Sequence, residues 1–249
     1  MNPVLDEIYK TRIVTDDEGN TRDAFPASIQ YADGQALYDI TSQTKATRTL
    51  EIGMAFGLST LFVCQAHKDK GAGHHTAIDP WQKRWFNNIG LRNVRNAQLD
   101  GDFRFFEAPS FEALAELGSK GERFDFVFID GNHRFDYTLV DFFLVDKILN
   151  VGGHVMLHDP WMPSIRKILS FILRNRADSF ELVPEFGGGQ RSMGKALLKF
   201  AWDLRKNWID PGSALIFARH RFNNYCMLHK TADFDEEAFG QQWDHYAPF

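Results

Sequence analysis

Short apolar runs alternate with longer segments of helical spacing along most of this chain. Apolar residues recur at helical spacing at 58–70 and 134–150, and Gly152 and Gly153 follow the second segment as a stop signal. Apolar runs with the length of strands lie at 47–53, 74–80, 103–109, 124–130, 152–159, 179–186 and 223–231. This alternation predicts an α/β fold in which a parallel sheet carries helices on both faces.

The segments that do not follow this alternation of strands and helices predict the domain organisation. Residues 1–46 are polar and irregular, with an exposed loop expected at 15–23 and a helix at 28–43. We therefore expect an N-terminal helical and loop extension over 1–46. The main domain is expected over 47–249, with a helical insertion at about 187–222.

The predicted insertion contains the flexible sequence GGGQ and then a basic amphipathic helix over 191–208. Its apolar positions, opposite a row of lysines and arginines, are Met193, Leu197, Phe200, Ala201, Leu204 and Trp208. We expect the apolar side to pack on the domain and the charged side to face solvent. A dimer contact, an active-site lid and docking to a membrane surface are the alternatives.

Composition narrows the class of protein. The 249 residues, 44% apolar and 24% charged, suit a globular chain with a large core. A net charge of −5 without a long basic run disfavours nucleic acid as a partner. No stretch approaches the ~20 apolar residues of a membrane span, and the start lacks a signal-peptide pattern, so we expect a cytoplasmic protein without membrane insertion. Cys64 and Cys226 are expected to be buried thiols.

Aromatic residues exceed what such a core requires. The chain has 23 phenylalanines and six tryptophans, and the surplus is expected to line a pocket or an oligomer contact, with a homodimer favoured. Trp81, Trp85 and Trp161 follow predicted strand ends. They fit either a pocket wall or the core.

Ligands of an open parallel sheet bind beyond the carboxyl ends of its strands. The first predicted strand runs into EIGMAFGLST, where Glu51, Gly53 and Gly57 form the pattern E-x-G-x-x-x-G. The glycines permit a tight turn and close approach of a ligand, and the carboxylate suits a positive or neutral group rather than a pyrophosphate. Asp79 ends the second strand, where it either accepts hydrogen bonds from ribose hydroxyls or only forms an Asp-Pro turn.

The later strand ends carry further candidates. Ser110 is expected to cap the helix after the third strand, or to face an adenine edge as well. The fourth strand ends in IDGNH, and His133 there is a candidate general base or a structural residue near a helix start. His158, at the end of the fifth strand, is the competing base or ligand, whereas His154 is expected only to pack.

Four segments in this order resemble the class I S-adenosylmethionine-dependent methyltransferases: LEIGMAFGLST, AIDPW, FDFVFIDGNHRFDYTLVDF and LNVGGHVMLHD. Within that class they are similar to small-molecule O-methyltransferases related to catechol and macrolide-sugar O-methyltransferases, over about residues 35–185. The resemblance implies a Rossmann-like, doubly wound sheet of seven mostly parallel strands with a reversed last strand. It also implies transfer of a methyl group from S-adenosyl-L-methionine to a hydroxyl of a small molecule.

The resemblance also implies site residues. Glu51 and Gly53 would contact the amino-acid end of the cofactor, Asp79 the ribose and Ser110 the adenine region. The full set of implied cofactor residues is Glu51, Gly53, Met54, Gly57, Ser59, Asp79, Pro80, Trp81, Ser110 and Asp130. The candidate catalytic residues are His133, Asp130 and His158, and His133 stands where catechol-type relatives carry a lysine.

A metal site follows from the same resemblance. Metal-dependent members hold Mg²⁺ or another divalent cation with carboxylates after the fourth and fifth strands, here Asp130 and Asp159. Adjacent strands lie ~4.8 Å apart, so the two carboxylates could share one ion. Pro160 stands where the family adds a third oxygen ligand, and Asn132 is an alternative source of that oxygen.

Two rival functions remain open at this point. A nucleotide-linked oxidoreductase is disfavoured because the third glycine of the dinucleotide fingerprint is missing. A non-catalytic cofactor-binding or scaffold protein of the same fold would use the helix at 191–208 to contact a partner. The acceptor class, whether sugar, phenol, polyketide or lipid-like, is open as well.

Overall fold

The computed structural model describes residues 2–183, 192–219, 222–234 and 247–249, and it divides into two units. The first spans 1–131 and the second 132–249. This division falls inside the predicted 47–249 domain, and the expected boundary at 46/47 stays a prediction.

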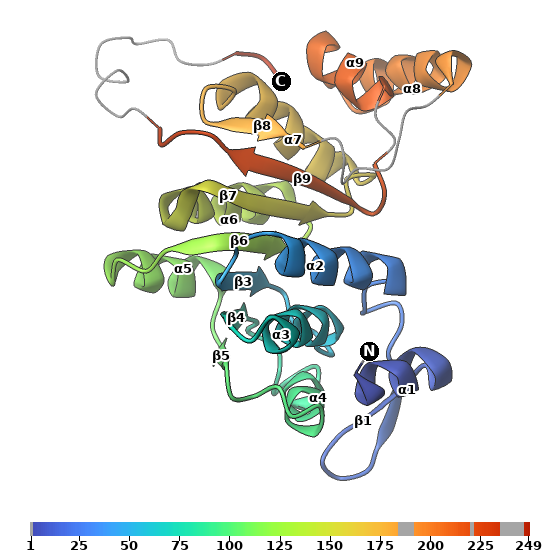
Figure 1. The fold of residues 1–249 in the computed structure, drawn as a ribbon. Helices are drawn as coiled ribbons and strands as arrows, with labels where there is room; N and C mark the ends of the chain where they lie inside the picture. The colour runs from blue at the N-terminus through green and yellow to red at the C-terminus, as the bar shows by residue number, and fades with distance from the viewer. Residues whose placement is uncertain (1, 184–191, 220–221, 235–246) are drawn as a thin grey trace. The chain divides into compact units, whose positions relative to one another are not determined.

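The first unit contains four parallel strands in the order β5-β4-β3-β6. The strands are β3 (Arg48–Ile52), β4 (His74–Ile78), β5 (Phe103–Phe106) and β6 (Phe124–Ile129). The helices after the first three of them are α3 (Leu58–Lys70), α4 (Ile89–Asn96) and α5 (Ser110–Ser119). Another helix, α2 (Tyr31–Gln43), packs against α3 (Figure 1). Gly34 permits this packing, since a Cβ there would lie 2.1 Å from a ring carbon of Phe62.

The N-terminal segment is more ordered than expected. A helix, α1 (Pro3–Thr11), precedes a hairpin of β1 (Ile13–Thr15) and β2 (Thr21–Asp23). Residues 17–23 are exposed as predicted, but the predicted loop over 15–23 is wrong at its ends, which are strands. The buried carboxylate of Asp16 accepts hydrogen bonds from the N–H groups of Glu18 (3.0 Å) and Asn20 (2.8 Å). These bonds close the turn of the hairpin.

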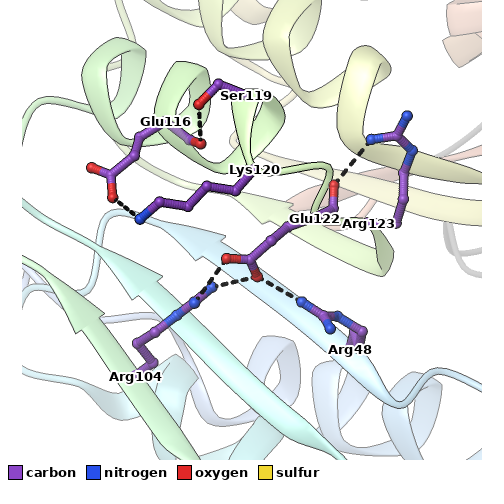
Figure 2. Close-up of polar contacts among 7 residues, drawn as sticks. All are labelled: Arg48, Arg104, Glu116, Ser119, Lys120, Glu122 and Arg123. Atoms are coloured by element: carbon purple, nitrogen blue, oxygen red, sulfur yellow. Dashed lines mark hydrogen bonds and ion pairs between the residues drawn. The ribbon is translucent and has the colours of Figure 1, made fainter.

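The amino ends of the first unit's strands are joined by charge pairs. Figure 2 shows Glu122, just before β6, with both carboxylate oxygens toward the guanidinium of Arg104 on β5, at 2.9 and 2.8 Å. The same carboxylate accepts from Arg48 at the start of β3, at 2.6 Å. Bidentate arginine–carboxylate pairs of this kind are among the stronger surface interactions.

The second unit contains three strands in the order β7-β9-β8, with β9 antiparallel to both neighbours. Its strands are β7 (Leu149–His158), β8 (Phe180–Leu182) and β9 (Tyr225–Lys230). Its helices are α6 (Phe135–Ile148), α7 (Pro163–Asn175), α8 (Met193–Lys206) and α9 (Pro211–Arg219). The predicted fold class is confirmed: a Rossmann-like sheet of seven strands, mostly parallel, with the last strand reversed.

The transition from α6 to β7 differs from the prediction. Gly152 and Gly153 do not stop the helix but lie inside β7, which begins at Leu149 directly after Ile148. Leu149 is buried and extended, with φ −82° and ψ 131°, so packing of this side chain turns the chain into the strand without a loop.

The orientation of α8 is also not the expected one. Its buried residue is Asp203, which forms an ion pair with the buried Arg166 of α7. Apolar side chains of and after this helix are exposed, among them Met193 (81%), Leu197 (63%), Leu198 (75%), Trp202 (55%) and Trp208 (79%). The expected packing through the apolar side is therefore wrong, because a buried charge pair holds the helix instead. The GGGQ sequence and Arg191 lie outside the described residues.

The cores account for much of the phenylalanine content. Fully buried rings include Phe62, Phe124, Phe126 and Phe128 in the first unit and Phe142, Phe180 and Phe217 in the second. Cys64 and Cys226 are free and buried, as predicted. Within the part of the chain that the structure describes, no helix combines the length and apolar character needed to cross a membrane.

Candidate functional site

The turn after β3, residues 53–57, is called the glycine turn below. Gly53 and Gly57 have φ values of +92° and +80°, which favour glycine. A Cβ on Gly53 would lie 2.4 Å from the carbonyl oxygen of Asp130, so no larger residue fits. Ala55, between them, also has a left-handed φ of +46°. The sequence pattern therefore marks a tight turn where β3 ends.

Asp79 at the end of β4 holds this turn from one side. Its Oδ2 accepts hydrogen bonds from the N–H groups of Met54 (3.0 Å) and Ala55 (2.8 Å), and its Oδ1 accepts from Trp81 N–H at 2.8 Å. The residue is 3% exposed. Asp79 is thus more than an Asp-Pro turn, because its carboxylate orders the neighbouring glycine turn.

Two residues that the sequence did not single out hold the turn's carbonyl groups. Gln82 Nε2 donates to the oxygen of Ala55 at 2.5 Å, and Asn93 Nδ2 of α4 donates to the oxygen of Phe56 at 3.0 Å. Both side chains are buried. With Asp79 they form the turn clamp, defined as Asp79, Gln82 and Asn93. No motif could reveal it, since isolated Gln and Asn carry no spacing signal.

Glu51 lies fully buried in β3. It accepts a hydrogen bond from Thr60 Oγ1 of α3, and its Oε1 is 3.4 Å from His75 Nε2. Thr49 Oγ1 lies 2.8 Å from nitrogens of both His75 and His67, so these residues form a buried polar network. Burial, with help from His75 and Lys70, lowers the pKa of His67 to about 4, so this ring is neutral. The predicted contact of Glu51 with a cofactor stays a prediction.

The remaining predicted cofactor residues surround the same strand ends. Met54 and Ser59 are buried, whereas Pro80 and Ser110 are partly exposed. Ser110 is not the cap of α5, since that position is held by Pro109, whose carbonyl accepts the N–H groups of Glu112 and Ala113. An adenine contact of Ser110 remains a prediction.

Trp81 and Trp85 stack on each other, with ring centroids 4.1 Å apart and planes inclined by 9°. They are 36% and 53% exposed, so the alternative of a core position is wrong. The pair presents an aromatic surface directly after Asp79. Trp161, which follows β7, is also exposed, at 61%.

The second unit brings His133, His158 and Asp159 together, and these three residues are called the His–Asp cluster. Asp159 Oδ2 lies 3.1 Å from His133 Nε2 and 3.5 Å from His158 Nδ1. One ligand atom from each residue lies within 4.8 Å of the others. Asp159 follows β7 with a left-handed φ of +52°, which turns its carboxylate back toward both rings.

Hydrogen bonds dominate the electrostatics of Asp159. Burial acts to raise the pKa of its carboxyl, but hydrogen bonds from His133, His158 and Trp161 outweigh burial and hold the pKa well below its usual range. Trp161 Nε1 donates to Oδ1 at 2.7 Å. Asp159 is therefore a carboxylate at neutral pH, with one oxygen toward the indole and the other toward the imidazoles.

The neighbours of the cluster are close in the chain. His133 directly precedes Arg134, the cap residue of α6, so it lies near a helix start, and its ring lies against Asp159. Asn132 Oδ1 accepts the N–H of Arg134 at 3.1 Å. His154 stacks on His229, with centroids 4.8 Å apart, as expected for a packing role.

Asp130 ends β6 in the first unit. Its N–H donates to the oxygen of Ile52 at 2.9 Å, which places its backbone beside the glycine turn. Its predicted roles in catalysis, cofactor binding and metal binding stay predictions.

The chain is similar in sequence and fold to known methyltransferases. Residues 50–160 match a family model described as a methyltransferase domain. No curated protein matches the sequence. Among solved structures, an O-methyltransferase from Bacillus cereus in complex with SAH is 17% identical, with 74% of this chain and 83% of that chain covered and a TM-score of 0.60.

Two further structures align over most of the chain. The O-methyltransferase TomG from Streptomyces achromogenes, in complex with SAM, is 15% identical, covering 93% of this chain and 91% of that one at a TM-score of 0.60. The SAH-bound Podospora anserina methyltransferase PaMTH1 is 12% identical, covering 93% and 89% at a TM-score of 0.60. Residues 50–160 are therefore similar to a methyltransferase domain, and the chain has the Rossmann-like fold of these methyltransferase structures.

Proposed function

We propose that this protein transfers a methyl group from S-adenosyl-L-methionine to a hydroxyl of a small molecule. The glycine turn carries the proposal, because the turn clamp fixes both its N–H groups and its carbonyls at the carboxyl end of the sheet. The match to a methyltransferase domain over 50–160 supports it. The O-methyltransferase neighbours support a hydroxyl as the acceptor group.

The residues of the first unit suit this cofactor. Gly53 and Gly57 let the backbone approach the amino-acid end of the ligand, and Asp79 Oδ1 accepts a single N–H, leaving a lone pair for a ribose hydroxyl. The stacked Trp81 and Trp85 offer an aromatic face for the adenine. When bound, the sulfonium supplies an activated methyl group for in-line displacement.

The His–Asp cluster supports removal of the acceptor's proton. Without a metal ion, His133 is the proposed base, because Asp159 lies 3.1 Å from its Nε2 and orients the ring. His158 is the second candidate, although it is less exposed, at 10% of its side chain against 30% for His133. Asp130, three residues before His133 in the chain, is proposed to orient the acceptor.

Isothermal calorimetry with S-adenosylhomocysteine tests the cofactor part. Wild-type protein is expected to bind, and Asp79→Ala to lose about 100-fold in affinity, because two N–H groups of the glycine turn lose a charged acceptor. Asp100→Ala, at an exposed aspartate of the same unit, is the matched control. No binding by the wild type ends the proposal.

Product detection tests the reaction itself. Mass spectrometry of a panel of sugars, phenols, polyketides and lipid-like alcohols should show a gain of one methyl group on oxygen in at least one compound. Binding of the cofactor without any methylated product would favour the non-catalytic alternative.

We also propose that the protein is a homodimer. The exposed apolar side chains of α8 support this, since large exposed apolar patches commonly mark protein contacts. Light scattering on a sizing column measures the mass, and Trp202→Lys is expected to shift it to the monomer. A monomeric wild type contradicts the proposal.

A further inference from the structure

We infer that the His–Asp cluster binds a first-row transition-metal ion and prefers it to Mg²⁺. The inference deepens the proposed function, since it concerns the group that the acceptor hydroxyl would meet. The resemblance to metal-dependent relatives implies Mg²⁺ or another divalent cation, and the inference concerns which of these ions is bound.

The spacing of the three side chains fits one coordination shell. Ligands bonded at ~2.1 Å lie ~3.0 Å apart at right angles and ~3.4 Å apart at the tetrahedral angle. His133 Nε2 and His158 Nδ1 lie 3.1 and 3.5 Å from the same oxygen, Oδ2 of Asp159. Two imidazole nitrogens that converge on one carboxylate oxygen from separate segments resemble a ligand set more than a single hydrogen-bonded pair.

The chemistry of these donors does not fit Mg²⁺. Mg²⁺ requires near-octahedral oxygen ligands and keeps several waters, whereas imidazole nitrogen suits Zn²⁺, Fe²⁺, Co²⁺ and Ni²⁺. Pro160 has no side-chain oxygen, and two of the three donors in the cluster are imidazole nitrogens. His158 therefore supplies nitrogen beside Asp159, where the resemblance leads one to expect oxygen.

Two hydrogen bonds from residues outside the His–Asp cluster hold the cluster in position. Trp161 Nε1 binds Asp159 Oδ1 at 2.7 Å, which leaves Oδ2 directed at the two rings. Ser164 Oγ donates to the carbonyl oxygen of His133 at 2.6 Å and so fixes the loop that carries this histidine. Such outer partners orient metal ligands and tune affinity. Two histidines and one carboxylate occupy one face of an ion and leave positions for other ligands, such as an acceptor oxygen.

The cluster has a metal-bound state and a metal-free state. His133 Nε2 binds the ion in the first and holds a proton in the second. The base role proposed above therefore belongs to the metal-free protein alone.

Titration of chelator-treated protein tests the inference. Calorimetry with Zn²⁺ and Mg²⁺ is expected to give at least ~100-fold tighter binding of Zn²⁺. Co²⁺ is expected to develop visible d–d absorption that is lost in His133→Ala and in His158→Ala. His154→Gln, in the same strand but outside the cluster, is the control and should leave the spectrum unchanged.

A second substitution tests the preference between two metal ions rather than the loss of metal binding. His158→Asp replaces nitrogen by oxygen, so it should narrow the Zn²⁺/Mg²⁺ affinity ratio by at least about tenfold. Equal affinity of the wild type for both ions, or a Co²⁺ spectrum unchanged by both alanine variants, overturns the inference. S-adenosylhomocysteine binding in the chelated protein is a separate readout. If it persists while no metal binds, the metal inference alone fails.

Discussion

The glycine turn and the His–Asp cluster are built in opposite ways. In the turn, the buried side chains of the turn clamp hold the backbone N–H and carbonyl groups in place. In the cluster, side chains themselves face one another, with His133 and Asp159 partly exposed and His158 buried, and a loop brings His133 to the end of β7. Backbone sites need glycine at defined positions, so they leave a pattern in the sequence. Side-chain clusters need only convergence in space.

The largest expected effect comes from Gly53→Ala in the turn. The added Cβ would lie 2.4 Å from Asp130 O at a φ of +92°, so we expect a loss of ~3 kcal/mol or more in the free energy of unfolding, together with loss of S-adenosylhomocysteine binding. Gly19→Ala is the matched control, since its φ is +88° but no atom lies within 4 Å. That variant should lose only ~1 kcal/mol. Equal losses in urea unfolding would refute the role of close approach.

A change in the cluster should separate chemistry from cofactor binding. Asp159→Asn removes the charge that both imidazoles approach, so kcat is expected to fall about 100-fold or more while the dissociation constant of S-adenosylhomocysteine stays unchanged. Asp178→Asn, at an exposed position of the same unit, is the control. A parallel loss of cofactor affinity would contradict the division between the two regions.

The turn clamp should act on cofactor affinity without entering the reaction. Asn93→Ala removes the donor to Phe56 O, and we expect KM for the cofactor to rise about tenfold with little change in kcat. Asn96→Ala, at an exposed position of the same helix, should leave both constants unchanged. A fall in kcat at constant KM would assign Asn93 to the chemistry instead.

A substitution at the amino ends of the first unit's strands, opposite the glycine turn, should affect stability alone. Glu122→Gln weakens the pairs with Arg104 and Arg48, so we expect a loss of about 1 kcal/mol without any change in cofactor affinity. Hydrogen bonding and charge from Arg104 lower the pKa of Glu122, outweighing its burial. A carboxylate with a lowered pKa stabilises the fold above its unfolded pKa, roughly 4.3, and loses this contribution as pH falls through the folded value.

The pH dependence of stability tests this contribution of Glu122. Thermal unfolding between pH 7 and pH 3 should show a shallower acid-side decline for Glu122→Gln than for the wild type. Identical profiles would show that Glu122 does not contribute.

The smallest expected effect is a gain in stability at the turn. Ala55 has a φ of +46°, where an L-residue is strained, so Ala55→Gly should stabilise the protein by roughly 0.5–1 kcal/mol after the entropy cost of glycine. Urea unfolding measures the change. A destabilised variant would indicate that the Cβ of Ala55 makes a favourable contact that outweighs the strain.

Local pattern explains how much of the fold could be predicted. The run predicted at 58–70 is α3, and the strand predicted at 47–53 is β3, because their apolar spacing is set within a few residues. The hairpin of β1 and β2 was missed, since it depends on the buried carboxylate of Asp16 closing a polar turn. Polar sequence predicts exposure, but it does not reveal hydrogen bonds that bury a charge.

The sequence by itself determined the alternation of strands and helices, the glycine turn and the residues at each strand end. These features depend on backbone geometry and on spacing along the chain. Tertiary structure alone decided that Gln82 and Asn93 hold the turn. It also decided that Arg166 pairs with the buried Asp203 of α8 and that Trp161 orients Asp159. The reason is physical: such contacts join residues by proximity and hydrogen-bond direction after folding, and neither quantity is written in the order of the residues.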